Sequence, residues 1–456
     1  MSGISIGDRV NDPEPQLQQT DPVLRRRITR LAGPMAIAEL LGLIVPLGVI
    51  ALMGHMGDDA LYVRSLYMPL AFLFLAIQTA FDISNQVTTA TNAGRGRHER
   101  GWASASTMAV LWAATGLVVL IALLVAAPGL ADLLHVQQHA RGDFTSFLRW
   151  MALANITLLA PVLCASTLRG FGLPRRSMLV TLTAATVELG TVGGLGLAGG
   201  MGVDAVPIAC ALAGACGGTL GLVLLRRHGL WRPGERLVWC PDSLVTLRQV
   251  GLPVGASYLV MFGSNLALLW VLNPYGPTVI SGYSIAGSLQ SAIIMPGLVV
   301  GSATAIVMNH QRGAATHALL PRTLRCGLQL TLAAYLVIVV VVWFGRHGLA
   351  GLATDNSRVA DVTAHYLAIV GLTYLLMGLV LTATTIMEQI GASLPALLLN
   401  VAYFGGVVVV GGILTRHLDD PDALYKTIAG FNLCGVLAVG IAVWAVRRAA
   451  RAGESG

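Results

Sequence analysis

The stretch LAGPMAIAELLGLIVPLGVIALMGHMGDDAL, residues 31–61, has a counterpart in VGLPVGASYLVMFGSNLALLWVLNPYGPTVI, residues 250–280. The two align without a gap at one constant separation, and the correspondence continues along the chain. The matched pairs include Pro34 and Pro253, Gly57 and Gly276, Ser65 and Ser284, Gly94 and Gly313, and Gly172 and Gly391. Proline and glycine fix where a backbone bends or turns, so their shared spacing is stronger evidence than matched apolar residues. The sequence therefore predicts two copies of one unit.

The composition indicates a membrane protein. Hydrophobic residues make up 55% of the chain and charged residues only 11%, against about 25% charged in an ordinary soluble domain. Apolar stretches longer than 18 residues recur, each able to cross a hydrocarbon core of about 30 Å. The cysteines are scattered without a C-x-x-C pair, so we expect buried packing residues, with no disulfide, metal site or cofactor.

The hydrophobic pattern predicts an all-α membrane protein with twelve transmembrane helices in two pseudo-symmetric six-helix lobes. The expected divisions are a disordered tail (1–24), a first lobe (25–225), a linker (226–243), a second lobe (244–446) and a short tail (447–456). The expected spans are 31–53, 61–91, 102–127, 144–168, 177–199, 202–225, 244–272, 279–309, 317–345, 359–386, 393–414 and 424–446.

Basic residues predict the topology. With both termini in the cytoplasm, 22 of the 29 Lys and Arg residues fall in cytoplasmic tails and loops, the Arg169 to Arg176 loop included. This distribution is typical of multi-pass proteins of the cell membrane and argues against nucleic-acid binding as the reason for the net charge of +7. Six spans per copy make the repeats parallel, as in transporters whose two lobes rock around a central cavity. The sequence contains no constellation typical of a membrane enzyme and no filter-like loop typical of a channel.

Several motifs resemble the multidrug and toxic compound extrusion (MATE) family. They are the quoted first span, NAGRGRHER (92–100), LRGFGLPRRSM (168–178), GMGVDAVPIA (200–209), GLPVGASYL (251–259), NPYGP (273–277) and IIMPGLVVG (293–301). Their order and spacing cover roughly residues 25–445. The resemblance implies an antiporter that exports organic, often cationic, compounds in exchange for protons or sodium.

The sequence departs from the family at the coupling carboxylates. Family members usually carry an aspartate in the first span, where this chain has Val49. The sodium-coupled branch carries a glutamate in the seventh span and an aspartate in the tenth, where this chain has Met261 and Met377. Neither the sodium site nor the standard proton site can therefore be carried over from the resemblance.

Three other carboxyls of the first lobe are candidates for proton coupling: Glu39, Asp82 and Glu188. Ionisable groups inside spans are costly and therefore functional candidates. At 1.5 Å per residue they lie about 12, 14 and 16 Å from the cytoplasmic ends of their spans. The hypothesis is that Glu188, at a position where the family commonly has an asparagine, replaces the aspartate together with Glu39 or Asp82. The alternative is that each carboxyl is protonated or hydrogen-bonded to a neighbouring group.

Further polar and aromatic residues are candidates for lining a substrate cavity, with packing as the alternative: Tyr67, Gln78, Asn85, Asn265, Trp270, Tyr283 and Gln290. Pro253 and Pro296 are candidate hinges or static kinks, because proline removes a backbone hydrogen bond. Asp361 and His365, one helical turn apart, form either an outer gate or a solvated pair. Glu388, opposite Arg169 in the repeat, is expected at the membrane interface.

The preferred hypothesis is a monomeric secondary antiporter that exports a small organic compound across the cell membrane in exchange for protons. Sodium-coupled export is less favoured. A flippase for lipid-linked precursors and an uncoupled membrane sensor or scaffold stay open as alternatives.

Overall fold

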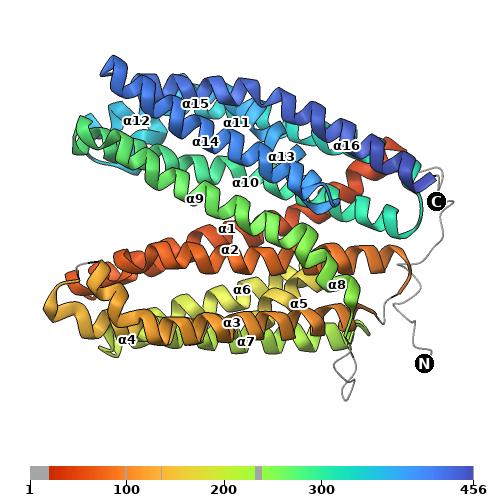
Figure 1. The fold of residues 1–456 in the computed structure, drawn as a ribbon, viewed down its shortest axis with the longest axis horizontal. Helices are drawn as coiled ribbons and strands as arrows, with labels where there is room; N and C mark the ends of the chain where they lie inside the picture. The colour runs from red at the N-terminus through yellow and green to blue at the C-terminus, as the bar shows by residue number, and fades with distance from the viewer. Residues whose placement is uncertain (1–19, 98–99, 135, 232–238, 455–456) are drawn as a thin grey trace.

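The protein is a bundle of membrane-length helices arranged in two lobes (Figure 1). The computed structural model describes residues 20–97, 100–134, 136–231 and 239–454, and twelve helices among these residues are long and apolar enough to cross a membrane. The α-helices are α1 (Asp21–Gly54), α2 (Asp58–Gly94), α3 (Arg100–Leu133), α4 (Arg141–Thr157), α5 (Leu159–Gly170), α6 (Pro174–Thr191), α7 (Ala205–Arg227), α8 (Pro241–Thr246), α9 (Leu252–Leu272), α10 (Pro277–Gly313), α11 (Leu320–Ala353), α12 (Ser357–Val370), α13 (Tyr374–Gln389), α14 (Ser393–Leu418), α15 (Asp422–Cys434) and α16 (Val436–Glu454).

Four of the spans are composite. The pairs α4 and α5, α8 and α9, α12 and α13, and α15 and α16 each form one membrane-length run. In the second pair, the π-helical turn Leu247–Gly251 joins α8 to α9. The twelve spans and the all-helical class confirm the prediction from hydropathy.

The backbone preserves the repeat at its turns. Gly57 and Gly276 each precede a helix and have positive φ angles of 117° and 88°. Gly172 and Gly391 each follow a helix and have φ angles of 75° and 92°. Glycine adopts this left-handed region without a Cβ clash, which explains why these positions match between the copies. The same conformation occurs at Gly96 and at its counterpart in the second copy, Ala315, which has a φ of 57°.

The two copies meet at equivalent positions of α2 and α10. A Cβ added to Gly94 would lie 2.1 Å from the carbonyl oxygen of His310, and one added to Gly313 would lie 2.2 Å from that of Thr91. These two contacts are equivalent in the two copies, because Thr91 and His310 also occupy matched positions. The pseudo-twofold axis therefore passes between two glycines that allow the helices to touch backbone to backbone.

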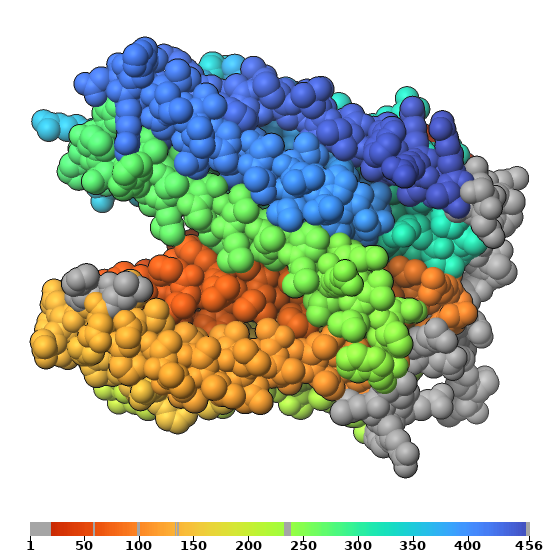
Figure 2. Space-filling model, in the orientation of Figure 1, coloured from red at the N-terminus to blue at the C-terminus, as the bar shows by residue number. Residues whose placement is uncertain are grey.

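The lobes touch at one end and separate at the other. Figure 2 shows a deep cleft between them that opens at the end opposite the one where α1 begins and α16 ends. We call these the open end and the terminal end. At the terminal end the first turns of α1 pack on α10 through Leu24, Ile28, Leu31, Met35, Val299, Ala303, Ile306 and Val307. Further toward the open end, Phe72 of α2 stacks on Phe262 of α9 with ring centroids 4.0 Å apart.

Several helices extend beyond the apolar core of their spans and across the predicted boundaries. Helix α1 begins at Asp21, inside the predicted tail, and Leu24 is already buried against the second lobe. Helix α8 begins at Pro241 inside the predicted linker, and α16 continues to Glu454 inside the predicted C-terminal tail. Residues 1–19 and 232–238 of the predicted tail and linker lie outside the described residues. Two cysteines expected to be buried, Cys216 and Cys434, are exposed.

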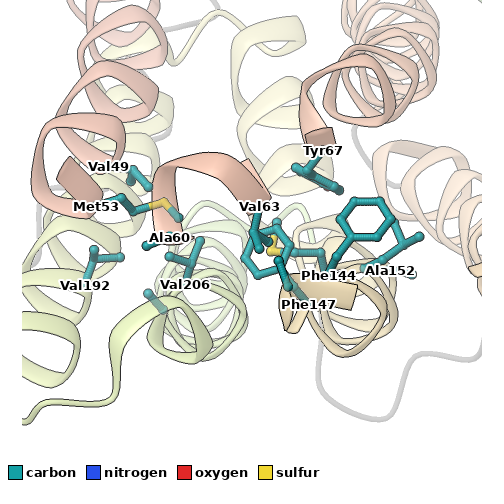
Figure 3. Packing of buried hydrophobic residues seen from close by; sticks show 14 of the residues in the cluster. Val49, Met53, Ala60, Val63, Tyr67, Phe144, Phe147, Ala152, Val192 and Val206 are labelled. Atoms are coloured by element: carbon teal, nitrogen blue, oxygen red, sulfur yellow. The ribbon is translucent and has the colours of Figure 1, made fainter. Parts of the chain in front are cut away.

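The core of the first lobe is apolar at Val49, where the resemblance implies an aspartate. Val49 is 2% exposed and belongs to a cluster with Met53, Val192 and Val206 (Figure 3). A carboxylate here would be surrounded by hydrocarbon. Any polar function of the first lobe must therefore rest on other residues.

Candidate functional site

An ion pair inside the first lobe is the central feature of the candidate site. Both carboxylate oxygens of Asp82, on α2, accept hydrogen bonds from Nη2 of Arg169, each at 2.6 Å. Arg169 lies in the last turn of α5, which packs along α2. The two side chains are 25% and 11% exposed. Since desolvating two charges is costly, such a pair persists only where the geometry and further hydrogen bonds compensate for it.

The guanidinium of Arg169 also connects the ion pair to the second lobe. Its Nε donates to Oε1 of Gln86 at 2.8 Å. The Gln86 amide nitrogen in turn donates to Oγ of Ser302 at 2.9 Å and to Oε1 of Gln389 at 3.0 Å. Ser302 belongs to α10 and Gln389 ends α13. A continuous polar chain therefore runs from a carboxylate of one lobe into the interface with the other.

Glu39 of α1 is the second carboxyl of this region. Its side chain is exposed, and it interacts electrostatically with both Asp82 and Arg169. Tyr258 of α9 interacts electrostatically with Glu39 and Asp82, which brings the second lobe to the same place. Of the three predicted carboxyls, Asp82 therefore pairs with Arg169, and Glu39 lies within electrostatic range of both.

The third carboxyl, Glu188, has a different neighbour. Its electrostatic partner is Arg64 of α2, whose guanidinium lies 5.5 Å from the ring centroid of Tyr67. Nε of Arg64 is buried and has no hydrogen-bond partner among the described residues. The first lobe therefore contains two separate charge clusters, Asp82 with Arg169 and Glu188 with Arg64.

The predicted cavity residues of the first lobe lie within that lobe. Tyr67 is 2% exposed in the apolar cluster of Figure 3, and its hydroxyl accepts from Asn155 at 3.2 Å. Asn85 is fully buried and donates to Ser166 and to Thr167, each at 2.8 Å. Gln78 lines a cavity of about 20 Å³ between α2, α3 and α4, enough for one water molecule.

The predicted cavity residues of the second lobe fall into two groups. Asn265 and Trp270 are exposed on α9, and the guanidinium of Arg416 lies 4.0 Å from the Trp270 ring centroid. Tyr283 and Gln290 face the interior of the lobe. Tyr283 stacks in a cluster with Tyr366 and Tyr425, and Gln290 accepts from the Tyr366 hydroxyl at 2.9 Å.

The two candidate hinge prolines have different surroundings. Pro253 opens α9 directly after the π-helical turn. Pro296 lies inside the continuous helix α10, where the hydroxyl of Tyr335, from α11, occupies the broken hydrogen-bond ladder. This hydroxyl donates to the carbonyl of Ile293 at 2.7 Å and accepts from the N–H of Gly297 at 3.3 Å. The second kink is therefore braced by a neighbouring helix.

Two further sequence candidates have partners that the sequence did not indicate. His365 pairs with Asp422 of α15 through Nε2 at 2.7 Å, instead of with Asp361. Glu388, expected at the membrane interface, is 8% exposed and accepts from Asn400 at 3.3 Å. Its position follows from the packing of α13 between α10, α11 and α16, which covers the end of the helix.

Sequence reasoning missed Arg169 and Gln86. Arg169 stands in LRGFGLPRR beside two other arginines, and the charge rule placed all three in a loop. A usable signal is the polar run from Asp82 to Asn92 in an otherwise apolar span, because buried amides and hydroxyls require partners. The sequence does not say where those partners are.

Comparisons with known proteins identify the family. The family model described as MatE matches residues 34–191 and again 253–414. The chain is 24% identical over 449 residues to a probable multidrug resistance protein NorM of Deinococcus radiodurans, covering 94% of this chain and 96% of that one. It is 25% identical over 315 residues to the multidrug resistance protein NorM of Burkholderia vietnamiensis, covering 62% and 63%.

Solved structures share the fold. The Vibrio cholerae MATE transporter VcmN in the bent form matches with a TM-score of 0.87 and 17% identity over 96% of this chain and 99% of that one. A transporter from Pyrococcus furiosus, described as having a binding pocket of reverse polarity, matches with a TM-score of 0.82 and 17% identity over 94% and 97%. The family model covers most of both lobes, and the chain therefore belongs to the multidrug and toxic compound extrusion (MATE) family of multidrug efflux transporters.

Proposed function

We propose that this transporter exchanges protons for small organic compounds, with Asp82 as the principal proton carrier and Glu39 as its neighbour. The observation that supports this is a carboxylate ion-paired with Arg169 inside a span and bonded through it to the lobe interface. Groups of this kind inside a membrane protein are typical of proton relays. Protonation of Asp82 removes the charge that holds Arg169, so the state of one carboxyl can influence how the lobes meet.

Glu39 supplies an accessible carboxylate beside this pair. Because it is exposed while Asp82 is partly buried, we propose that it takes part either in proton transfer to Asp82 or in binding a cationic substrate. Proton and substrate would then compete for the same negative charge. Competition at one site is the simplest way to make the exchange obligatory in alternating access.

Sodium coupling is less favoured by the residues present. A hard cation requires several oxygen ligands, and the carboxylates of the sodium-coupled branch are replaced here by Met261 and Met377. Met377 is 5% exposed in an apolar cluster of the second lobe. A thioether is a soft ligand and does not replace a carboxylate for sodium.

We propose that the protein is a monomer in the cell membrane. In the proposed orientation both termini lie in the cytoplasm. The excess of arginine at the terminal end supports it. The cleft of Figure 2 then faces the outside. We keep the division into lobes at 25–225 and 244–446 and propose that these units rock against each other, so that the glycine crossing at the terminal end is closed in one conformation and separated in the other.

The proposed substrate class rests on the names of the relatives alone. Two curated relatives are named as multidrug resistance proteins, and we propose drug-like organic compounds, cationic ones included, on that basis. The fold does not choose between substrates, since a structural neighbour is described as having a pocket of reverse polarity and a suggested different function.

The test is transport in liposomes that contain the purified protein and a trapped pH-sensitive dye. We expect addition of a cationic dye substrate to move protons in the opposite direction, without a requirement for sodium. Asp82→Asn should abolish this coupled proton movement, whereas Glu188→Gln, the same change at the carboxyl of the other cluster, should retain most of it. Retention by Asp82→Asn would refute Asp82 as the carrier. Substrate flux that requires sodium would favour sodium-coupled export. The absence of flux would favour an uncoupled sensor or scaffold. Movement of a lipid-linked substrate instead would favour a flippase.

A further inference from the structure

We propose that Gln86 is a positioning residue that transmits the charge state of Asp82 to the closed contact between the lobes. The inference rests on the proposed function, since it concerns how a proton on Asp82 changes the conformation. Gln86 touches Arg169 on one side and the second lobe on the other. Gln86 belongs to the first lobe and forms hydrogen bonds to residues of both lobes.

The orientation of the Gln86 amide is fixed by its partners. Arginine can only donate hydrogen bonds, so the amide oxygen must face Arg169. The two N–H groups must therefore face the second lobe, where they donate to Ser302 and Gln389. With Arg169 in place, the amide oxygen and both N–H groups of Gln86 have partners. The amide therefore cannot turn over without losing hydrogen bonds on both sides.

The energetic consequence follows from burial. Gln86 is 2% exposed and Gln389 is 1% exposed. When Asp82 is neutral, Arg169 loses the charged partner to which it is bonded, which weakens the attraction that holds it between Asp82 and Gln86. A buried amide oxygen left without its donor costs about 1–3 kcal/mol. That cost falls on the closed arrangement alone, because separated lobes expose Gln86 to water.

A second bond ties the same end of α5 to the second lobe. The carbonyl of Gly170, next to Arg169, accepts from Nε2 of His310 at 2.7 Å. Nδ1 of His310 faces the guanidinium of Arg27 at 2.8 Å. Arginine donates there, so Nδ1 must accept and Nε2 must carry the hydrogen. A shift of Arg169 would therefore disturb two lobe-to-lobe bonds together.

The repeat shows that this chain of bonds is not required by the fold. The positions of the second copy that match Asp82 and Gln86 are Gly301 and Ala305, and the counterpart of Arg169 is Glu388. The second lobe keeps the same helices without an equivalent ion pair or amide. The bonds of the first lobe therefore serve something beyond holding six helices together.

Within the described residues, the charged and titratable groups that act on Asp82 lie on three other helices. Arg169 faces it from α5, and Glu39 of α1 and Tyr258 of α9 interact with it electrostatically. Of these, Arg169 alone is bonded to Gln86. The route from Asp82 to the interface therefore passes through Arg169 and then Gln86.

The experiment measures the conformation of the full-length protein in lipid with pairs of spin labels, in a background without native cysteines. One pair, at Arg226 and Arg447, spans the lobes at the terminal end, and a second, at His55 and Leu352, spans them at the open end. All four side chains are exposed. The variants are Asp82→Asn, Gln86→Leu and the double variant.

We expect both single variants to raise the population with a separated terminal end by roughly 5- to 150-fold. The open end should narrow in the same population, a reciprocal change that simple loosening would not produce. The double variant should exceed neither single variant, because both act on one chain of bonds.

The matched control is Gln311→Leu. Gln311 is another buried glutamine, 3% exposed, whose amide exchanges hydrogen bonds with Thr323 inside the second lobe. This variant should leave both distances unchanged. If Gln86→Leu does not fold, Gln389→Leu removes the same bond from the other side and should give the same reciprocal shift.

Unchanged distances in Gln86→Leu, or effects that add fully in the double variant, would overturn the proposal. These outcomes are separable from failure of the proposed function. If Asp82→Asn abolishes proton coupling in liposomes while Gln86→Leu keeps the wild-type distances, the carrier stands and the transmission through Gln86 falls.

Discussion

The glycine crossing provides the sharpest test of how the lobes close. Gly94→Ala places a Cβ 2.1 Å from the carbonyl oxygen of His310, about 1 Å short of the 3.0 Å that real Cβ atoms require. The obstacle is backbone of α10, so rotation of a side chain cannot relieve it. We therefore expect α2 and α10 to separate by about 1 Å at the terminal end.

The magnitude follows from the cost of overpacking. Forcing extra atoms into a close contact costs about 1–3 kcal/mol, and this cost applies only where the lobes are closed at the terminal end. The population with a separated terminal end should rise by roughly 5- to 150-fold. Spin labels at Arg226 and Arg447 would measure it as a second, longer distance, with a shorter distance appearing between labels at the open end.

The matched control is Gly287→Ala, on the same helix as His310. Nothing lies within 4 Å of the added Cβ, and alanine stabilises a helix interior by up to about 1 kcal/mol relative to glycine. Its distances should match the wild type. If Gly94→Ala also keeps the wild-type distances while remaining folded, local adjustment of α10 relieves the clash, and the crossing does not limit how closely the lobes meet at the terminal end.

Two further predictions concern stability, measured as the thermal unfolding midpoint in detergent. Tyr335→Phe should lower the free energy of unfolding by about 1–3 kcal/mol because it leaves two backbone groups at the Pro296 kink without a partner. The control is Tyr425→Phe, which should be neutral because the Tyr425 hydroxyl has no partner among the described residues. Equal midpoints for the two variants would contradict the role of Tyr335 at the kink. Arg169→Gln should lower the free energy of unfolding by about 3–5 kcal/mol because it leaves the Asp82 carboxylate unpaired. Adding Asp82→Asn to this variant should restore part of the lost stability. If the losses of the two changes add instead, the two side chains do not stabilise each other.

The sequence predicts the frame of this protein well because the frame depends on local properties. Span length follows from the bilayer thickness, and glycine is favoured at a turn that needs positive φ. Gly57 and Gly276, matched in the sequence, share that conformation in the structure. Helix ends are harder to predict, since apolar content ends before the helix does, as at Asp21 and Glu454.

The candidate site depends on contacts that no local pattern contains. Asp82 and Arg169 are far apart in the sequence and belong to different spans. Depth along the helices suggested that Glu188 would join Asp82, but depth says nothing about which face of a helix a residue occupies. The structure gives Glu188 a separate partner, Arg64. Residue spacing can place groups at one level of the membrane, and only the packing of helices brings them together.

The two copies differ at the position of the ion pair. In the second lobe Gly301 lets α10 approach α13, since a Cβ there would lie 2.9 Å from Cβ of Thr385. The equivalent position in the first lobe is Asp82, which holds Arg169 instead. A charge pair in both lobes would give two proton sites with no difference between them. If Asp82 carries the proton as proposed, the proton changes one side of the interface alone, and the Gln86 contacts lie on that side.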